Sequence, residues 1–257
     1  MTKYPIILVH GMALRDTRFI RAFGKIEKKL FDAGYNVYTA NTDAFGTVEN
    51  NAEQLKDIIQ NILTQANSDK VNIIAHSKGG LDSKYMISNL GMSDKVASLT
   101  TLCTPHKGSL VATKIWNLPM WLKKYLSFFI NLFYKIIGDK NPNSLKVCEQ
   151  LKSNQDDLSK DTIADNVYCQ SYSTILRSRK DCLLMAVPMK IFTKAGETGN
   201  DGLVSESSSM FGEYKGECLD ESVSHTQIVD LLAKRKNRHK IFEFYIGLCK
   251  ELEEIGY

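Results

Sequence analysis

Short apolar runs alternate with amphipathic segments along most of this chain. Amphipathic helices are predicted at residues 19–30, 48–66 and 241–252, where apolar side chains recur three or four positions apart. The apolar runs are continuous and short, as is typical of parallel strands buried on both faces. They lie at residues 4–10, 35–39, 71–75 and 97–103. Strands that alternate with helices predict a mostly parallel central sheet with helices on both faces.

The alternation stops after residues 104–109 and resumes with two further runs, at 167–171 and 188–193, which are predicted to be the last strands. We interpret the interruption as a helical insertion at about residues 110–150. The remainder predicts one α/β domain over residues 1–257, a length that is ample for a single core.

The centre of the insertion, residues 115–137, is rich in aromatic and leucine residues and holds both tryptophans of the protein. Lysines interrupt it, and its uncharged stretch is shorter than the roughly 18 residues of a membrane span, so no transmembrane segment is predicted. We expect a lid that covers the site at the ends of the strands and contacts a lipid interface transiently. A fully buried helical hairpin is the alternative. The residues expected to cover or bind substrate are Trp116, Trp121, Phe128, Phe129 and Phe133.

The overall composition is that of an ordinary globular protein, with 43% hydrophobic and 24% charged residues and a formal net charge of +4. So small a net charge does not indicate a nucleic-acid partner. One basic run, residues 234–240, is interpreted as a solvated junction of helices, with contact to an anionic lipid surface as the alternative.

The cysteines and the first residues bear on metal binding and location. The six cysteines form no C-x-x-C pair, which argues against a zinc or redox motif and leaves one disulfide open. Residues 1–5 lead directly into a predicted strand without the pattern of a signal peptide. A cytoplasmic location is therefore expected, with a secreted mature form as the alternative.

A strand, a sharp turn and a helix are predicted around Ser77, the pattern of a nucleophile elbow. Such a turn requires small residues two positions before and after the nucleophile, because larger side chains would strike the neighbouring strand and helix. Ala75 and Gly79 meet this requirement. Ser77 is therefore the candidate nucleophile, with a helix-capping serine as the alternative.

A serine nucleophile needs a base to accept its proton and an acid to orient that base. His225 is the candidate base and Asp201 the candidate acid, and both follow Ser77 in the order Ser, Asp, His that accompanies a nucleophile elbow. His239 is a weaker candidate, since it lies in the basic run and is expected to be exposed. Asp201 also lies in an Asn-Asp-Gly sequence, which is common in turns without catalysis.

The oxyanion of an acyl-transfer reaction needs backbone donors, and the candidates are the amides of Met12 and Lys78. The side chain of Lys78 is expected either near the cleft or in solvent. The remaining histidines are expected to support loops around the elbow. They are His10, His76 and His106.

Four blocks of sequence, residues 4–12, 75–83, 104–109 and 200–205, together resemble bacterial triacylglycerol lipases of the α/β-hydrolase superfamily. The resemblance implies the α/β-hydrolase fold and the roles proposed above for the candidate residues. Many of these lipases bind calcium through an aspartate two residues after the catalytic histidine, where this chain has Gln227. A neutral amide is a poor calcium ligand, and only His239 is left over for zinc, so no metal and no cofactor are expected.

The sequence thus predicts a serine hydrolase of carboxylic esters, and the resemblance implies a lipase that cleaves acylglycerols through an acyl-enzyme. A short-chain carboxylesterase, a thioesterase and an acyltransferase would use the same residues. A non-catalytic lipid-binding protein with this fold is the alternative from another class.

Overall fold

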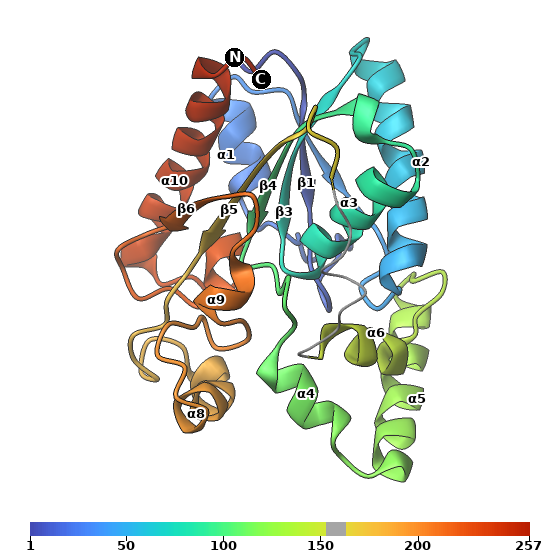
Figure 1. Ribbon diagram of the computed structural model, residues 1–257, viewed down its shortest axis with the longest axis vertical. Coiled ribbons are helices and arrows are strands. Elements are labelled where there is room, and N and C mark those ends of the chain that lie inside the picture. The colour runs from blue at the N-terminus through green and yellow to red at the C-terminus, as the bar shows by residue number, and fades with distance from the viewer. Residues whose placement is uncertain (153–162) are drawn as a thin grey trace.

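In the computed structural model, which describes residues 1–152 and 163–257, a six-stranded parallel sheet forms the centre of the molecule (Figure 1). The strand order is β2-β1-β3-β4-β5-β6, and every neighbouring pair is parallel. The strands are β1 Ile6–Val9, β2 Val37–Ala40, β3 Val71–His76, β4 Val96–Leu102, β5 Tyr168–Ser173 and β6 Glu213–Glu217. The predicted parallel sheet is confirmed.

Helices cover both faces of this sheet because its strands are apolar on both sides. In β1, Ile6 and Leu8 belong to one core cluster, which includes residues of α1 (Ile26–Asp32) and α10 (Arg235–Glu254). The alternate residues, Ile7 and Val9, belong to a second cluster with α2 (Val48–Ala66) and α3 (Lys78–Asn89). All four side chains of β1 are fully buried, so this strand lies in the middle of a three-layered structure.

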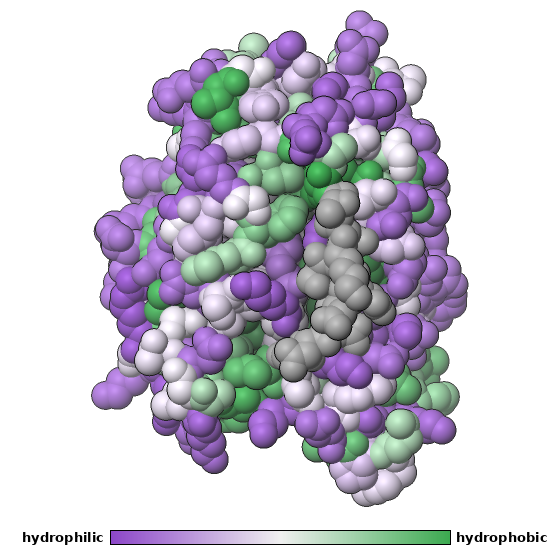
Figure 2. Space-filling view, in the orientation of Figure 1, coloured by the Kyte–Doolittle hydropathy of each residue, from purple (hydrophilic) through white to green (hydrophobic). Residues whose placement is uncertain are grey.

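The helical insertion follows β4 and precedes β5, and its described residues form the helices α4 Leu110–Trp116, α5 Met120–Ile136 and α6 Ser144–Leu151. It lies beyond the carboxyl ends of the strands (Figure 1). On the face drawn in Figure 2, apolar surface gathers in the lower part, between α8 (Ala186–Lys194) and α4, whereas much of the upper part is hydrophilic. Among the described residues, no helix has both the length and the apolar character needed to cross a bilayer.

Short elements complete the described part of the chain. They are α9 Glu206–Ser209 and three turns of 3₁₀ helix at Ser93–Lys95, Leu183–Met185 and Gln227–Val229.

The strand predicted at residues 188–193 is wrong, because this segment is the helix α8. Pro188 lies in its first turn, where a missing amide hydrogen costs nothing, whereas a central strand would lose a ladder hydrogen bond there. Phe192 is fully buried, and Met189 packs beside the small cluster formed by Leu176, Cys182 and Met185.

The last strand is β6 instead, and its sequence hides it. It is an edge strand with exposed or half-buried residues, so it lacks an apolar run. The helix predicted from residue 19 begins only at Ile26. Phe19 is exposed, and Gly24 has a φ of +50°, which interrupts the helical backbone.

Candidate active site

Ser77 lies at the turn between β3 and α3 with a φ of 54° and a ψ of −131°. This region of φ strains a residue with a Cβ, and such strain is typical of residues held in place for a purpose. The neighbouring backbone explains the small residues around it. A Cβ on Gly79 would lie 2.5 Å from the carbonyl oxygen of His10, and one on Gly11 would lie 2.6 Å from the Cβ of Ser77. The elbow predicted from the sequence is therefore present.

The structure brings Ser77, His225 and Asp201 together in one chain of hydrogen bonds. The Ser77 Oγ lies 2.8 Å from the His225 Nε2, and the His225 Nδ1 lies 2.6 Å from the Asp201 Oδ2. The other Asp201 oxygen accepts hydrogen bonds of 2.8 Å from the amides of Leu203 and Val204. These bonds hold the carboxylate in one orientation.

The loop that carries His225 is held from several sides. Its amide donates to the Asp201 carbonyl at 3.0 Å, and the His76 Nε2 donates to the His225 carbonyl at 2.9 Å. The Gln227 side chain accepts from the Ser224 amide and donates to the Asp181 carbonyl. Gln227 thus supports this loop with its own amide group, at the position where the calcium-binding lipases have an aspartate.

Two buried histidines have the supporting place expected of them. Burial, and then the nearby His225, hold the pKa of His76 well below its usual value, so its ring is neutral. Burial, and then the charges of Lys84 and Lys107, lower the pKa of His106 to about 3. The His106 ring stacks on Phe211 at 4.6 Å. His239, the weaker candidate for the base, is exposed on α10.

The two candidate oxyanion donors lie on either side of the elbow. Lys78 is the first residue of α3, where the amide has no acceptor within the helix. Within the described part of the chain, the Met12 amide makes no hydrogen bond to protein. Met12 and Ser77 line the same cavity. Both amides are thus available to an oxyanion.

The Lys78 side chain is neither in solvent nor in the cleft. It is 1% exposed, and its Nζ lies 2.6 Å from the Asp82 Oδ1 one turn along α3. The Asn51 side chain donates to the second Asp82 oxygen at 3.1 Å. Burial raises the pKa of Asp82 to about 6, although Lys78 opposes this shift. The helical spacing of four residues could have revealed this pair from the sequence.

A cavity of about 390 Å³ opens between the carboxyl ends of the strands and the insertion. Ser77, His225 and Met12 line it on the side of the sheet, and its remaining lining is mostly apolar. Apolar side chains of the insertion in this lining are Val111, Ala112, Ile115, Leu118, Leu126, Ile130, Leu145 and Leu151. Leu203 and Val204, which belong to the sequence block at residues 200–205, also line it. The size and lining are those of a site for a small apolar ligand.

The aromatic residues predicted to bind substrate do not line this cavity, so the prediction is corrected in that respect. The inward positions of α5 are Lys123, Leu126, Ser127 and Ile130, which recur at helical spacing. With these positions facing inward, the other side of the helix faces solvent. It carries the predicted residues Trp121, Phe128, Phe129 and Phe133, and each is exposed. The fifth predicted residue, Trp116, packs under the ammonium groups of Lys123 and Lys152.

The exposed face also excludes a fully buried hairpin. Because α5 is apolar on nearly all sides, its sequence does not reveal which face points inward.

One group of residues in the described ranges could bring three metal ligands together: Cys103, Asp201 and His225, whose ligand atoms lie within 4.8 Å of one another. Asp201 and His225 are already hydrogen-bonded to each other, and burial raises the pKa of the Cys103 thiol well above its usual value. A protonated thiol is a poor metal ligand, so this group does not fit a metal site.

Comparison with known proteins gives consistent relatives. The sequence model of the palmitoyl protein thioesterase family matches residues 5–171. A triacylglycerol lipase of Pseudarthrobacter phenanthrenivorans is 33% identical over 150 residues, which cover 54% of this chain and 46% of that protein. Triacylglycerol lipase 2 of Saccharomyces cerevisiae is 25% identical over 270 residues, covering 90% of this chain and 73% of that protein. The chain spans less than half the length of the bacterial lipases from Pseudarthrobacter and Burkholderia plantarii.

Solved structures share the fold. A metagenomic carboxyl esterase superposes with a TM-score of 0.75 at 15% identity, over 99% of this chain and 76% of that one. The mature lipase of Bacillus licheniformis gives a TM-score of 0.67 at 18% identity, over 96% and 92% of the two chains. These likenesses identify the α/β-hydrolase fold.

Proposed function

Because this chain belongs to the palmitoyl protein thioesterase family, we propose that it is a serine hydrolase that cleaves long-chain carboxylic esters through an acyl-enzyme on Ser77. The observation that carries the proposal is the hydrogen-bonded chain of Ser77, His225 and Asp201 at the wall of an apolar cavity. The cavity suits an acyl chain, and relatives named triacylglycerol lipase favour acylglycerols as the substrate class.

In the proposed reaction each of these groups has one step, and the geometry supports it. The Ser77 oxygen attacks the acyl carbon while the His225 Nε2 accepts the serine proton. The Asp201 carboxylate keeps the His225 ring oriented and stabilises its charged form. The amides of Met12 and Lys78 bind the oxyanion that develops on the acyl oxygen. His225 then gives the proton to the leaving alcohol, and a water molecule hydrolyses the acyl-enzyme by the same steps.

A thioester substrate is the second candidate, and the match to the thioesterase family model favours it. A thiol has a pKa of about 8.5, so it leaves as a thiolate with little help from an acid. An alcohol, in contrast, needs the proton that His225 delivers. Paired palmitoyl esters of an alcohol and of a thiol would therefore rank the two candidates by kcat/KM.

The proposed function is tested with p-nitrophenyl esters of increasing acyl length, assayed with the wild type and Ser77→Ala. We expect turnover by the wild type that rises with chain length, and loss of turnover in the variant with its circular dichroism unchanged. The matched control is Ser207→Ala, on the exposed side of α9, which should keep full turnover. Wild-type turnover in Ser77→Ala would contradict the proposal. A preference for short esters would leave the hydrolase and remove the long-chain substrate.

We also propose that the outer face of α5 contacts a lipid interface. Trp121, Phe128 and Ile136 are exposed there, Leu183 is exposed just before α8, and Val187 is exposed in the first turn of α8. An apolar surface of this kind is stabilised by contact with lipid. Trp121 fluorescence should shift to shorter wavelength when micelles are added, and an unshifted spectrum would contradict the contact.

A further inference from the structure

Three consecutive peptide units after β1 are each held by a hydrogen bond, and the first of them contains the Met12 amide. The Gly11 carbonyl accepts from the His10 Nδ1 at 2.9 Å. Burial lowers the pKa of His10, so its ring is neutral and donates from Nδ1. Because a peptide unit is planar and trans, a fixed Gly11 oxygen also fixes the direction in which the Met12 N–H points.

The next two peptide units are held through Ala13. Its amide donates to the Ala44 carbonyl at 3.0 Å, and its carbonyl accepts from the Tyr134 hydroxyl at 3.0 Å. Ala13 has a φ of 64°, a strained value for a residue with a side chain. Such a conformation persists only when the surroundings impose it. Tyr134, near the end of α5, supplies one of the two restraints.

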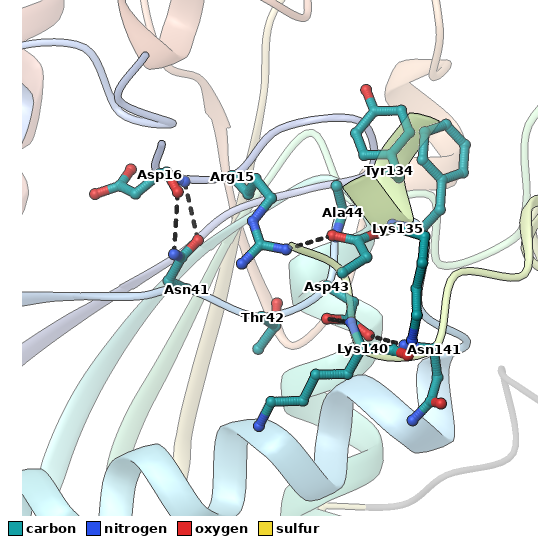
Figure 3. A network of polar contacts seen from close by, with 12 residues as sticks. Arg15, Asp16, Asn41, Thr42, Asp43, Ala44, Tyr134, Lys135, Lys140 and Asn141 are labelled. Carbon is teal, nitrogen blue, oxygen red and sulfur yellow. Dashed lines mark hydrogen bonds and ion pairs between the residues drawn. The ribbon is translucent and has the colours of Figure 1, made fainter. Parts of the chain in front are cut away.

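The second restraint also depends on the end of α5. The Asp139 carboxylate accepts hydrogen bonds from the amides of Ala44 and Phe45, at 3.0 and 2.9 Å, and it pairs with Arg15 at 2.6 Å. Arg15 and Ala44 are labelled in Figure 3. Ala44, whose carbonyl holds Ala13, is therefore itself held by Asp139. The Asp139 side chain is fully buried. A buried carboxylate with two amide donors and a guanidinium has its charge compensated, so this contact is not easily given up.

A second carboxylate makes the reverse connection. Asp43 accepts from the amides of Lys140 and Asn141, at 2.8 and 2.7 Å (Figure 3). The Asp43 carbonyl accepts from Asn51, whose side chain also donates to Asp82. The end of the insertion is thus tied in both directions to the segment that follows β2.

We propose that the end of α5 positions the Met12 amide for the oxyanion, with Tyr134 and Asp139 acting as positioning residues through Ala13 and Ala44. The insertion then has two parts with different tasks. The inner face of α5 lines the cavity, whereas residues 134–141 belong to the support of the oxyanion hole. This inference rests on the proposed function, because it needs an oxyanion to be formed at Ser77.

The test is Tyr134→Phe, which removes the hydroxyl and keeps the ring that packs on Phe45 at 4.5 Å. The substrate is a soluble short-chain p-nitrophenyl ester below its aggregation threshold, and rates are divided by active sites titrated with an alkyl phosphonate. We expect kcat to fall about tenfold, less than the roughly 10²-fold cost of losing a whole oxyanion donor, with KM nearly unchanged. The matched control, Tyr125→Phe on the exposed side of the same helix, should keep the wild-type kcat.

The outcomes distinguish a failure of the positioning role from a failure of the proposed function. An unchanged kcat per titrated site in Tyr134→Phe, or a rise in KM alone, would overturn the positioning role. A loss of rate that only follows a loss of titrated sites would do the same. Asp139→Asn, which keeps the shape and removes the charge that Arg15 faces, should lower kcat further. A wild type that the phosphonate does not titrate, or an active Ser77→Ala variant, would instead show that the proposed function has failed.

Discussion

The carboxyl ends of the strands and the insertion that covers them differ in the kind of side chain that they bury or expose. At the carboxyl ends, Asp201, His225 and Lys78 are polar, at most 5% exposed and hydrogen-bonded. On the insertion, Trp121 and Phe128 are apolar and 71% and 61% exposed. Buried polar groups are stable only with partners, and exposed apolar groups add little to the stability of the folded chain. Chemistry and substrate access therefore depend on separate sets of residues.

The largest effect should come from Asp201→Asn, at the carboxyl ends of the strands. An asparagine keeps the shape of the side chain, but it neither stabilises the charged form of His225 nor orients its ring correctly. We therefore expect kcat to fall about 10⁴-fold. The rate on a soluble p-nitrophenyl ester measures this. Asp57→Asn, on the exposed face of α2, is the control and should leave kcat unchanged. A fall of less than about tenfold would mean that Asp201 does not act on His225.

Asp82→Asn should cost about 3 to 5 kcal/mol of unfolding free energy, because it leaves the Lys78 ammonium buried without its partner. The double variant Lys78→Met/Asp82→Leu should recover most of this loss. The exposed pair of Lys28 and Asp32 has the same spacing, and its removal should cost at most about 1 kcal/mol. Urea unfolding compares the two pairs, and equal costs would contradict the contrast in burial.

The buried histidines should make the protein less stable in acid. The pKa values of His10, His76 and His106 are lowered by burial, so below about pH 6.5 the unfolded chain binds protons that the folded chain does not. As the pH falls, each of them lowers the unfolding free energy by up to about 1.4 kcal/mol per pH unit. For His106 this loss continues down to its pKa of about 3.

Asp82 acts in the opposite direction. Its raised pKa, about 6, makes the folded chain bind a proton between its ordinary value and about pH 6, so its contribution to stability grows as the pH falls through that window. Unfolding free energies at pH 7, 6 and 5 measure the sum. His106→Gln should make the slope shallower by about one proton, and an unchanged slope would show that His106 is charged in the folded state.

The smallest change in stability should come from the insertion. Phe128→Ser on the outer face of α5 should alter the unfolding free energy by no more than about 0.5 kcal/mol, because the ring is mostly in solvent. Turnover of emulsified esters should nevertheless fall several-fold, while turnover of a soluble ester stays the same. A large loss of stability would place Phe128 in a packed interface and weaken the comparison with the carboxyl ends of the strands.

The sequence predicts best where chemistry constrains neighbouring residues. The elbow around Ser77 requires a small residue at Gly79, and helix Val48–Ala66 carries a clear amphipathic pattern, so both are found from the sequence. The family resemblance adds the order of Asp201 and His225, but no local pattern gives their distance from Ser77.

Other features depend on packing that the sequence does not encode locally. The buried state of Lys78 follows from Asp82 and Asn51, which come from two helices. The strand β6 is polar because it lies at the edge of the sheet. The face of α5 that points inward is determined by its packing over the cavity. Because the outer face is apolar as well, the sequence does not show which residues point inward.

Covalent labelling with a p-nitrophenyl alkyl phosphonate, read by peptide mass spectrometry, tests whether Ser77 is the nucleophile and whether His225 activates it. The account predicts one adduct per chain, on Ser77, formed in step with the loss of esterase activity, and labelling that is far slower in His225→Ala. Complete loss of activity with Ser77 unmodified, or an equally fast reaction in His225→Ala, would contradict it.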